Sequence, residues 1–183
     1  ADVPPGGVSG VATLHLSGYM YVAAPSLASA LLALRDAREA GVPVSVDPAS
    51  AGFLAELGAD RFLAAADGAE VLLPNADEAR SLTGHGEPER AAAELSRRFP
   101  LVVVTLGQAG ALVAENGSVT ARVTAPTVGP VDSTGAGDAF TGAFLAARLA
   151  GADPAKAADA GCRAGAEAVT VVGGRPPTGP PGG

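Results

Sequence analysis

The sequence predicts a layered α/β domain with a mostly parallel sheet and a β-hairpin on its C-terminal side. Short apolar strands alternate with helical stretches over the first hundred residues, a rhythm typical of parallel strands joined by right-handed crossovers. Asn116-Gly117 stands between two further apolar-rich runs, as in a type I′ hairpin turn. Apolar residues form 48% of the 183 residues and charged residues 17%, a composition that can bury a core.

The first strand and helix are predicted from an apolar run and a leucine pattern. Residues 11–16 form an apolar run typical of a buried strand. Pro25 then opens a helix, and Gly41 stands where a glycine commonly ends one. We expect the core-facing stripe of this helix to consist of Leu27, Leu31 and Leu34.

The next elements repeat the alternation of strand and helix. Residues 42–46 predict a second short strand, which ends at Asp47. Residues 51–66 predict a helix with a break near Gly58, because glycine disfavours a helix interior. Residues 70–73 predict the third strand.

A helical pair, the most apolar strand and the hairpin follow. Residues 75–83 and 87–98 predict two helices separated by a glycine-containing loop. Residues 101–105 are the most apolar strand of the chain. The hairpin strands are predicted over 111–115 and 118–123.

Two helices and a Gly/Pro-rich tail complete the chain. One helix carries Phe140 and Phe144 on one face, and a last helix is predicted over 153–169 with an aspartate cap. Nine of the eleven residues 173–183 are Gly or Pro, so we expect this tail to be disordered. The prediction is therefore one domain over 1–172 followed by the tail.

Composition excludes several classes of function. The formal net charge is −7 and no basic stripe is present, which argues against nucleic acid as a partner. The single cysteine, Cys162, excludes an internal disulfide and a thiolate zinc site. No apolar run reaches the ~18 residues of a membrane helix. Because the start also lacks the order of a signal peptide, we expect a cytoplasmic protein without membrane contacts. His15, in a strand expected to be buried, and His85 form no metal-ligand pattern.

The sharpest local motif is Gly135-Ala136-Gly137-Asp138 at the start of a predicted helix. Small residues let an anion approach the unsatisfied first N–H groups, where the helix dipole contributes about half a positive charge. Asp138 would repel that anion, but as a general base it could take a proton from a hydroxyl that attacks a phosphoryl group held there. The plainer interpretation is a tight turn followed by a first-turn aspartate that the dipole favours.

Two other glycine motifs do not fit. A Walker phosphate loop needs a lysine after its second glycine, and the only lysine, Lys156, lies in no such pattern. A dinucleotide-binding fingerprint needs a third glycine where Phe140 stands.

Two further motifs follow predicted strands. Asn75 with Glu78 three residues later is a variant of the helix capping box, and the same side chains could also serve a magnesium ion. The loop from Thr105 to Gly110 follows the fourth strand, at the edge where open α/β sheets bind ligands, although turn chemistry explains its glycines equally well.

Together the three motifs resemble the ribokinase-like (PfkB) carbohydrate kinase family. Residues 132–140 match the family's C-terminal signature, residues 73–78 match its Asn-x-x-Glu motif, and residues 104–107 match its Thr-x-Gly strand end. The motifs follow the family order, and the resemblance covers roughly residues 14–174. It implies a three-layer ribokinase-like fold and an ATP-dependent phosphotransferase acting on a hydroxyl of a sugar or related small molecule.

The resemblance also implies roles for single residues. Asp138 would be the catalytic base beside an anion hole at Gly135–Gly137. Asn75 and Glu78 would serve the magnesium and phosphate region. The nucleotide phosphates would lie near Thr105 and Gly107.

Other roles implied by the resemblance concern the end of the chain. Cys162 and Ala166 fall where the family lines its adenine pocket. Many members bind a monovalent cation such as K⁺, and Asp132 and Thr134 match that site. The main-chain carbonyls expected to complete this cation site are those near Ala168, Val171 and Gly173.

The chain departs from the family in length. Family members carry an additional N-terminal half that supplies several strands, the lid and the acceptor grip. The resemblance therefore implies the C-terminal, nucleotide-side portion of such a kinase, with Asp47 touching the active-site cleft. A sugar, a sugar acid and a nucleoside all stay open as the acceptor, and so does a homo-oligomeric state. The alternative is a catalytically inactive nucleotide-binding fragment or regulatory module.

Overall fold

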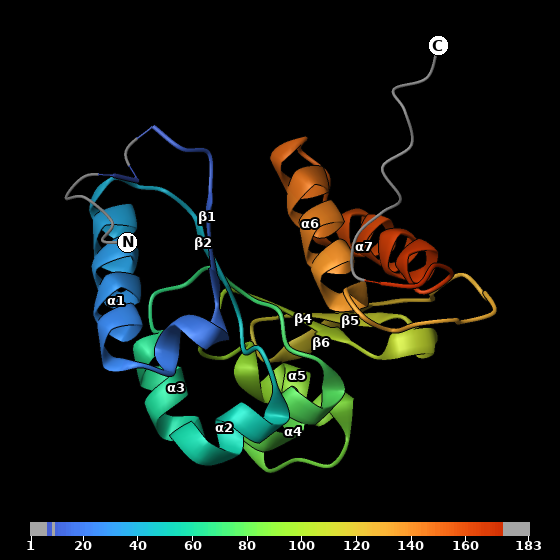
Figure 1. Cartoon of the computed structure of the whole chain (residues 1–183), viewed down its shortest axis with the longest axis horizontal. Coiled ribbons are helices and arrows are strands. Elements are labelled where there is room, and N and C mark those ends of the chain that lie inside the picture. Colours follow the sequence, from blue (N-terminus) through green and yellow to red (C-terminus); the bar gives the residue numbers. More distant parts are fainter. Residues whose placement is uncertain (1–6, 9, 174–183) are drawn as a thin grey trace. The chain divides into compact units, whose positions relative to one another are not determined.

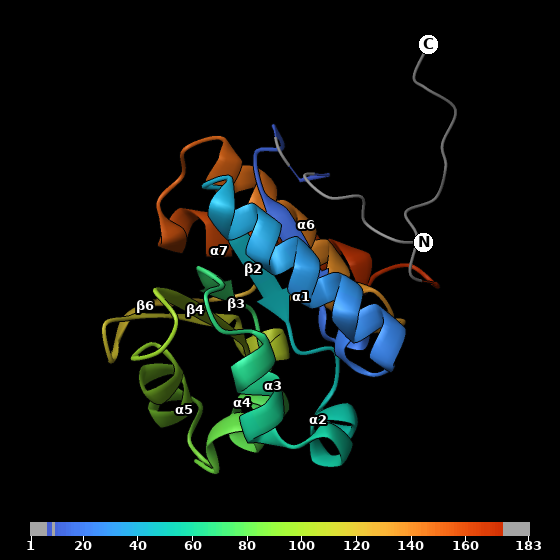
Figure 2. The same cartoon turned by 90° about the vertical axis from the view of Figure 1, so that its left-hand side faces the viewer.

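The computed structural model describes residues 7–8 and 10–173, which form two compact units. The first unit is the chain up to Thr105 together with Leu112–Ala121. The second unit is Leu106–Ala111 together with the chain from Arg122 onward. The elements of both units are labelled in Figures 1 and 2. All but the first residue of the predicted Gly/Pro-rich tail lies outside the described residues.

A mixed, mostly parallel sheet confirms the predicted α/β class. In the described part of the chain its six strands have the order β1-β2-β3-β4-β5-β6. The strands are β1 (Leu14–Ser17), β2 (Val44–Asp47), β3 (Val71–Leu72), β4 (Leu101–Thr105), β5 (Ala111–Glu115) and β6 (Ser118–Val123). The first four pair in parallel, with Leu14 opposite Val44 and Leu72 opposite Val102. The carboxyl ends of these four strands therefore meet at one edge of the sheet.

Helices connect the parallel strands, as the alternating pattern predicts. They are α1 (Ala24–Glu39), α2 (Ala51–Leu57), α3 (Ala59–Ala65), α4 (Ala76–Thr83) and α5 (Pro88–Leu95), with a short 3-10 helix, η1 (Gly18–Tyr21), before α1. The predicted break at Gly58 is confirmed, since its φ of +91° separates α2 from α3. Gly41, just after α1, also has a positive φ of +67°. Both glycines occupy conformations that other residues seldom adopt.

Two burial predictions in this region are wrong. Leu31 is 44% exposed, whereas Leu34 of the same predicted stripe is buried at 5%. The inward face of α1 is completed by small residues, with Ala30, Ala33 and Ala37 at most 2% exposed. His15 is exposed although its strand was expected to be buried. His15 and Leu16 point to opposite faces of β1, and only the face that carries Leu16 is buried. His15 Nδ1 lies 2.9 Å from Ser45 Oγ.

The hairpin has the turn that its sequence predicts. Asn116 and Gly117 both have positive φ angles, +52° and +78°, as a type I′ turn requires. The Gly117 N–H donates to Ser96 Oγ at 2.9 Å, which ties the turn to the end of α5. Each hairpin strand spans its predicted residues.

The second unit is dominated by two closely packed helices, α6 (Ala136–Leu149) and α7 (Pro154–Ala168). Phe140 and Phe144 are buried on one face of α6, as predicted, with their rings stacked at 6.2 Å. A Cβ at Gly161 would lie 2.8 Å from the Phe140 ring, and one at Gly165 would lie 3.2 Å from the Ala136 carbonyl. Glycines in α7 therefore allow the helices to approach closely. Among the described residues, no helix is both long and apolar enough to cross a bilayer.

Candidate active site

The carboxyl edge of the first unit's sheet gathers polar residues from three strands. Asp47 ends β2, Thr105 ends β4, and Asn75 follows β3 at the start of α4. Asn75 and Thr105 form a parallel bridge, and the Thr105 N–H donates to the Pro74 carbonyl at 2.9 Å. This edge is where open α/β sheets bind ligands.

Asn75 and Glu78 form a complete capping box at the start of α4. The Glu78 N–H donates to Asn75 Oδ1 at 2.9 Å, and the Asn75 N–H donates to Glu78 Oε2 at 2.8 Å. Asn75 Nδ2 also donates to Glu78 Oε1 at 2.7 Å. The plainer interpretation of this motif is thus confirmed, and it leaves the magnesium role untested. The capping box holds the Glu78 carboxylate in one orientation at the sheet edge.

Burial makes the Glu78 carboxyl unusually basic. Its side chain is only 4% exposed, and desolvation raises its pKa from 4.5 to about 7. The hydrogen bond from the Asn75 N–H opposes this shift, while the negative charges of Asp47 and Asp77 add to it. Glu78 therefore titrates near neutral pH, and Asp47 lies close enough to influence it.

The turn after β2 is strained. Ala49 has a φ of +73°, a left-handed conformation that disfavours residues with a Cβ. Its N–H donates to Asp47 Oδ1 at 2.6 Å, a local bond that helps to hold the turn. Strained backbone of this kind clusters at ligand sites, and here it lies beside a carboxylate at the binding edge.

The loop after β4 is a short 3-10 turn, η2 (Gly107–Ala109), in the second unit. Its ends are joined by the Leu106 N–H, which donates to the Gly110 carbonyl at 2.8 Å. A Cβ at Gly110 would collide with the Val123 carbonyl, so close packing explains why a glycine stands at this position. Gly107, with a φ of +59°, has open space around its Cα.

The N-terminus of α6 is open in the way an anion site requires. Gly135 precedes the helix with a left-handed φ of +78°, and no side chain caps this end. Gly137 and Asp138 are exposed, and a Cβ built at Gly137 would meet nothing within 4 Å. The Ala136 N–H is directed back to the Ser133 carbonyl at 3.3 Å, which leaves the Gly137 and Asp138 N–H groups as the outward donors.

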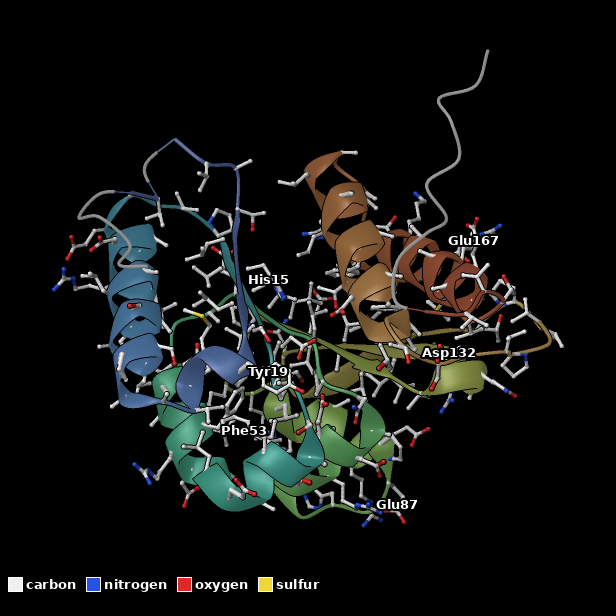
Figure 3. The ribbon with its side chains drawn as sticks, viewed as in Figure 1. His15, Tyr19, Phe53, Glu87, Asp132 and Glu167 are labelled. Carbon is white, nitrogen blue, oxygen red and sulfur yellow. The ribbon has the colours of Figure 1, made fainter. Side chains whose placement is uncertain are left out.

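Asp132 fastens the loop before α6 to the segment after α7 (Figure 3). Its Oδ1 accepts the Thr134 N–H and its Oδ2 accepts the Gly173 N–H, each at 2.9 Å. These hydrogen bonds lower the pKa of Asp132, and the bond from the Thr134 N–H has the largest effect. The Val131 N–H donates to the Val169 carbonyl at 2.7 Å. Asp132, Thr134 and the segment around Gly173, predicted to share a cation site, are thus brought together.

The two residues predicted near adenine lie on α7. Cys162 is 5% exposed, and desolvation followed by the charge of Asp159 raises the pKa of its thiol to about 11. The thiol is therefore neutral and shielded. Ala166 lies one turn further along and is half-buried. Within the described residues, no three His, Cys, Asp or Glu side chains form a metal-binding group.

One exposed residue at this edge of the sheet, Tyr19, belongs to none of the motifs found in the sequence. Tyr19 follows the end of β1 by two residues and is 64% exposed. Its position could have indicated a place at the ligand-binding edge. Like Asn75, Tyr19 closely follows the end of a parallel strand.

Comparisons with known proteins assign the chain to one protein family. Residues 8–179 match the model of the pfkB family carbohydrate kinase. A fructokinase of Klebsiella pneumoniae is 34% identical over 141 residues, which are 73% of this chain and 45% of that protein.

The chain is also similar in structure to solved kinases of sugars and nucleosides. The fructokinase of Vibrio cholerae O395, in its fructose-, ADP- and calcium-bound form, superposes with a TM-score of 0.79 at 29% identity, covering 94% of this chain and 60% of that one. The aminoimidazole riboside kinase of Salmonella enterica, complexed with aminoimidazole riboside and an ATP analogue, gives 0.77 at 29% identity, covering 87% and 56%. The chain thus spans about half the length of the proteins that it matches.

Proposed function

The chain belongs to the pfkB family of carbohydrate kinases, and we propose that it transfers the γ-phosphoryl group of ATP to a hydroxyl of a sugar or nucleoside. The observation that carries the proposal is the open N-terminus of α6, with an exposed Asp138 in its first turn, in a chain that matches the family over residues 8–179. The bound fructose and aminoimidazole riboside of the two structural relatives support this range of acceptors.

Asp138 acts as the general base in the proposed reaction. Its carboxylate accepts the proton of the acceptor hydroxyl as the hydroxyl oxygen forms a bond to the γ-phosphorus, and ADP leaves with the electrons of the broken bond. The outward N–H groups of Gly137 and Asp138, with the helix dipole, stabilise the negative charge on the transferring group. The exposure of Asp138 suits this role, because an acceptor must reach it.

Magnesium fits the carboxyl edge of the first unit. Asn75 and Glu78 supply the amide and carboxylate oxygens that Mg²⁺ prefers, and the charge of Asp47 raises the pKa of Glu78, a repulsion that a divalent cation offsets. Bound there, the ion would neutralise charge on the phosphates of ATP. Asn75 also orients Glu78, because its Nδ2 donates to Glu78 Oε1 at 2.7 Å.

The remaining assignments extend the same proposal. Asp132 and Thr134 hold a monovalent cation such as K⁺ beside the α6 N-terminus, where Asp132 keeps its negative charge. Thr105 and Gly107 contact the nucleotide phosphates, and the half-buried Ala166 lines the adenine site beside Cys162. ADP and calcium in the solved fructokinase support the use of a nucleotide and a metal ion.

The test is phosphoryl transfer that depends on Asp138. The purified chain is incubated with ATP, Mg²⁺, K⁺ and a pool of sugars and nucleosides, and mass spectrometry identifies any acceptor that gains a phosphoryl group. Asp138→Asn should lower the rate by about 10²- to 10⁴-fold. The matched control is Asp60→Asn, because Asp60 is also exposed in the first turn of a helix preceded by a positive-φ glycine. A loss below about threefold for Asp138→Asn would remove it from the role of base.

A second candidate function is a nucleotide-binding module without catalysis. It is favoured by the share of its relatives that the chain spans, 45% of the Klebsiella fructokinase. This alternative predicts that ATP with Mg²⁺ binds in calorimetry while no acceptor gains a phosphoryl group. An Asp138-dependent product would exclude it.

A further inference from the structure

The Tyr21 hydroxyl is buried without a hydrogen-bond partner among the described residues. Tyr21 is 1% exposed, and no described group lies within hydrogen-bond reach of its Oη. Burial raises the pKa of this phenol to about 12, so the hydroxyl stays neutral. A polar group that loses its bonds to water on folding and gains none in return destabilises the folded state. A phenylalanine would fill the same space without that cost, so the hydroxyl calls for an explanation.

Tyr21 anchors a segment that few other interactions hold. The residues that η1 buries are Gly18 and Tyr21, so Tyr21 supplies its one buried side chain. The Tyr21 ring meets that of Phe62 on α3 edge-to-face at 5.5 Å. No side chain caps the start of η1, and the Val22 N–H donates to the Tyr19 carbonyl at a long 3.3 Å. The attachment of η1 to the first unit therefore depends largely on a ring whose hydroxyl is unpaired.

The loop after β2 packs against η1 and is itself strained. A Cβ at Gly18 would collide with the Pro48 carbonyl and would lie 2.8 Å from the Asp47 carbonyl oxygen, so the two loops are in close contact. In the loop after β2, Ala49 has a left-handed φ of +73°. Such a conformation persists only where the surroundings impose it. A displacement of η1 would remove this contact, so the unpaired hydroxyl and the strained alanine favour the same movement.

The chain around Tyr21 has little packing to lose in that movement. Tyr19 is 64% exposed (Figure 3), and residues 22–25, which lead from η1 into α1, are all exposed. Segments with few buried contacts are those in which local opening costs least. The loss of packing would therefore be confined mainly to Tyr21 and to the contact between Gly18 and Pro48.

We propose that η1 and the loop after β2 open together as one local unit, in which Tyr21 leaves its packing against Phe62 and its hydroxyl becomes hydrated. Both loops follow strand ends at the carboxyl edge of the sheet, so the closed and open states present this edge differently to a ligand. The inference goes beyond the proposed function, because the opening requires neither ATP nor phosphoryl transfer.

Amide hydrogen exchange, resolved by NMR spectroscopy, measures this opening in the full chain without ligands. The Val22 N–H reports on η1. The N–H groups of Ala49 and Ser50, which donate to Asp47 Oδ1 at 2.6 Å and to the Pro48 carbonyl at 3.1 Å, report on the loop after β2. The amides of β4 report on global unfolding, because residues 101–104 are at most 6% exposed.

Two variants separate the buried hydroxyl from an exposed one. Tyr21→Phe deletes the buried hydroxyl and keeps the ring that packs against Phe62. The matched control, Tyr19→Phe, deletes the same group from an exposed ring two positions away. Circular dichroism compares the fold of each variant with that of wild type.

In wild type, the amides of Val22, Ala49 and Ser50 should exchange at least tenfold faster than those of β4, because local opening requires less free energy than global unfolding. Tyr21→Phe should slow exchange at these three amides by about 5- to 100-fold, because its closed state no longer buries an unpaired hydroxyl. Tyr19→Phe should leave them within about twofold of wild type, because its hydroxyl is exposed in both states.

Exchange of the two loops at the rate of β4 would overturn the inference, because the loops would then open only by global unfolding. Unchanged or faster exchange in Tyr21→Phe, or loss of its fold, would also overturn it, because the hydroxyl would then be bonded in the closed state, for example to an internal water. Slowing at Val22 alone would contradict the joint movement. No measurement involves phosphoryl transfer, so the proposed kinase function can fail while the opening is still observed.

Discussion

Replacing the buried carboxyl of Glu78 by an amide should change the way stability depends on pH. The folded state raises the pKa of Glu78 from 4.5 to about 7, mainly by desolvation. Between these two values the folded chain holds a proton that the unfolded chain releases, so stability falls as pH rises through this window. At about 1.4 kcal/mol per pH unit, the loss amounts to about 3 kcal/mol by pH 8.

Glu78→Gln is neutral at every pH and therefore escapes this loss. Its amide oxygen can still accept the Asn75 N–H, but its NH₂ group faces Asn75 Nδ2, a donor that now bonds Glu78 Oε1 at 2.7 Å. Losing that hydrogen bond costs about 1 kcal/mol. The variant should thus have nearly the stability of wild type at pH 5, where wild type has already lost about 1 kcal/mol, and should be more stable by about 2 kcal/mol at pH 8.

Urea denaturation at pH 5, 6, 7 and 8, in EDTA to remove divalent ions, measures both curves. Glu89→Gln is the matched control, because Glu89 also lies in the first turn of a helix but is exposed. If Glu78→Gln differs from wild type by the same amount at every pH, the assigned shift in the pKa of Glu78 is refuted.

Two further predictions concern packing. Gly110→Ala should destabilise the chain by more than about 3 kcal/mol, because the new Cβ meets the Val123 carbonyl at a φ of +97°. Gly84→Ala, with a φ of +76° and open space, should cost only about 1–2 kcal/mol in the same denaturation assay, and equal losses would contradict the clash. The Cys162 thiol, with its pKa raised to about 11, should react with iodoacetamide at pH 8 at least tenfold more slowly in the folded chain than in urea. Equal rates would show that the thiol is accessible.

Features that depend on neighbouring residues alone were predictable. Gly58 breaks a helix and Asn116-Gly117 turns a hairpin through their own backbone preferences, and both predictions are confirmed. The Asn75–Glu78 capping box is likewise a local motif, with its partners three positions apart. The family resemblance followed because short motifs keep their order along the chain, and the match over residues 8–179 confirms it.

Features that depend on the tertiary contacts of a side chain were not predictable from the sequence. The leucine spacing in α1 was compatible with a buried stripe, but the helix rotates its alanines inward and leaves Leu31 exposed. His15 is exposed while its neighbour Leu16 is buried, because only one face of β1 is covered, a property of packing and not of the strand's own residues.

The same division holds within the candidate site. The sequence by itself indicated the residues that we propose to carry the chemistry, since Asp138, Asn75 and Glu78 stand in motifs along the chain. Tertiary structure alone decided that burial, and to a lesser extent the charge of Asp47, raises the pKa of Glu78, and that Asp132 reaches Gly173, 41 residues away. The physical reason is that backbone conformation follows from adjacent residues, whereas burial, charge–charge interaction and exposure are set by partners that only folding brings together.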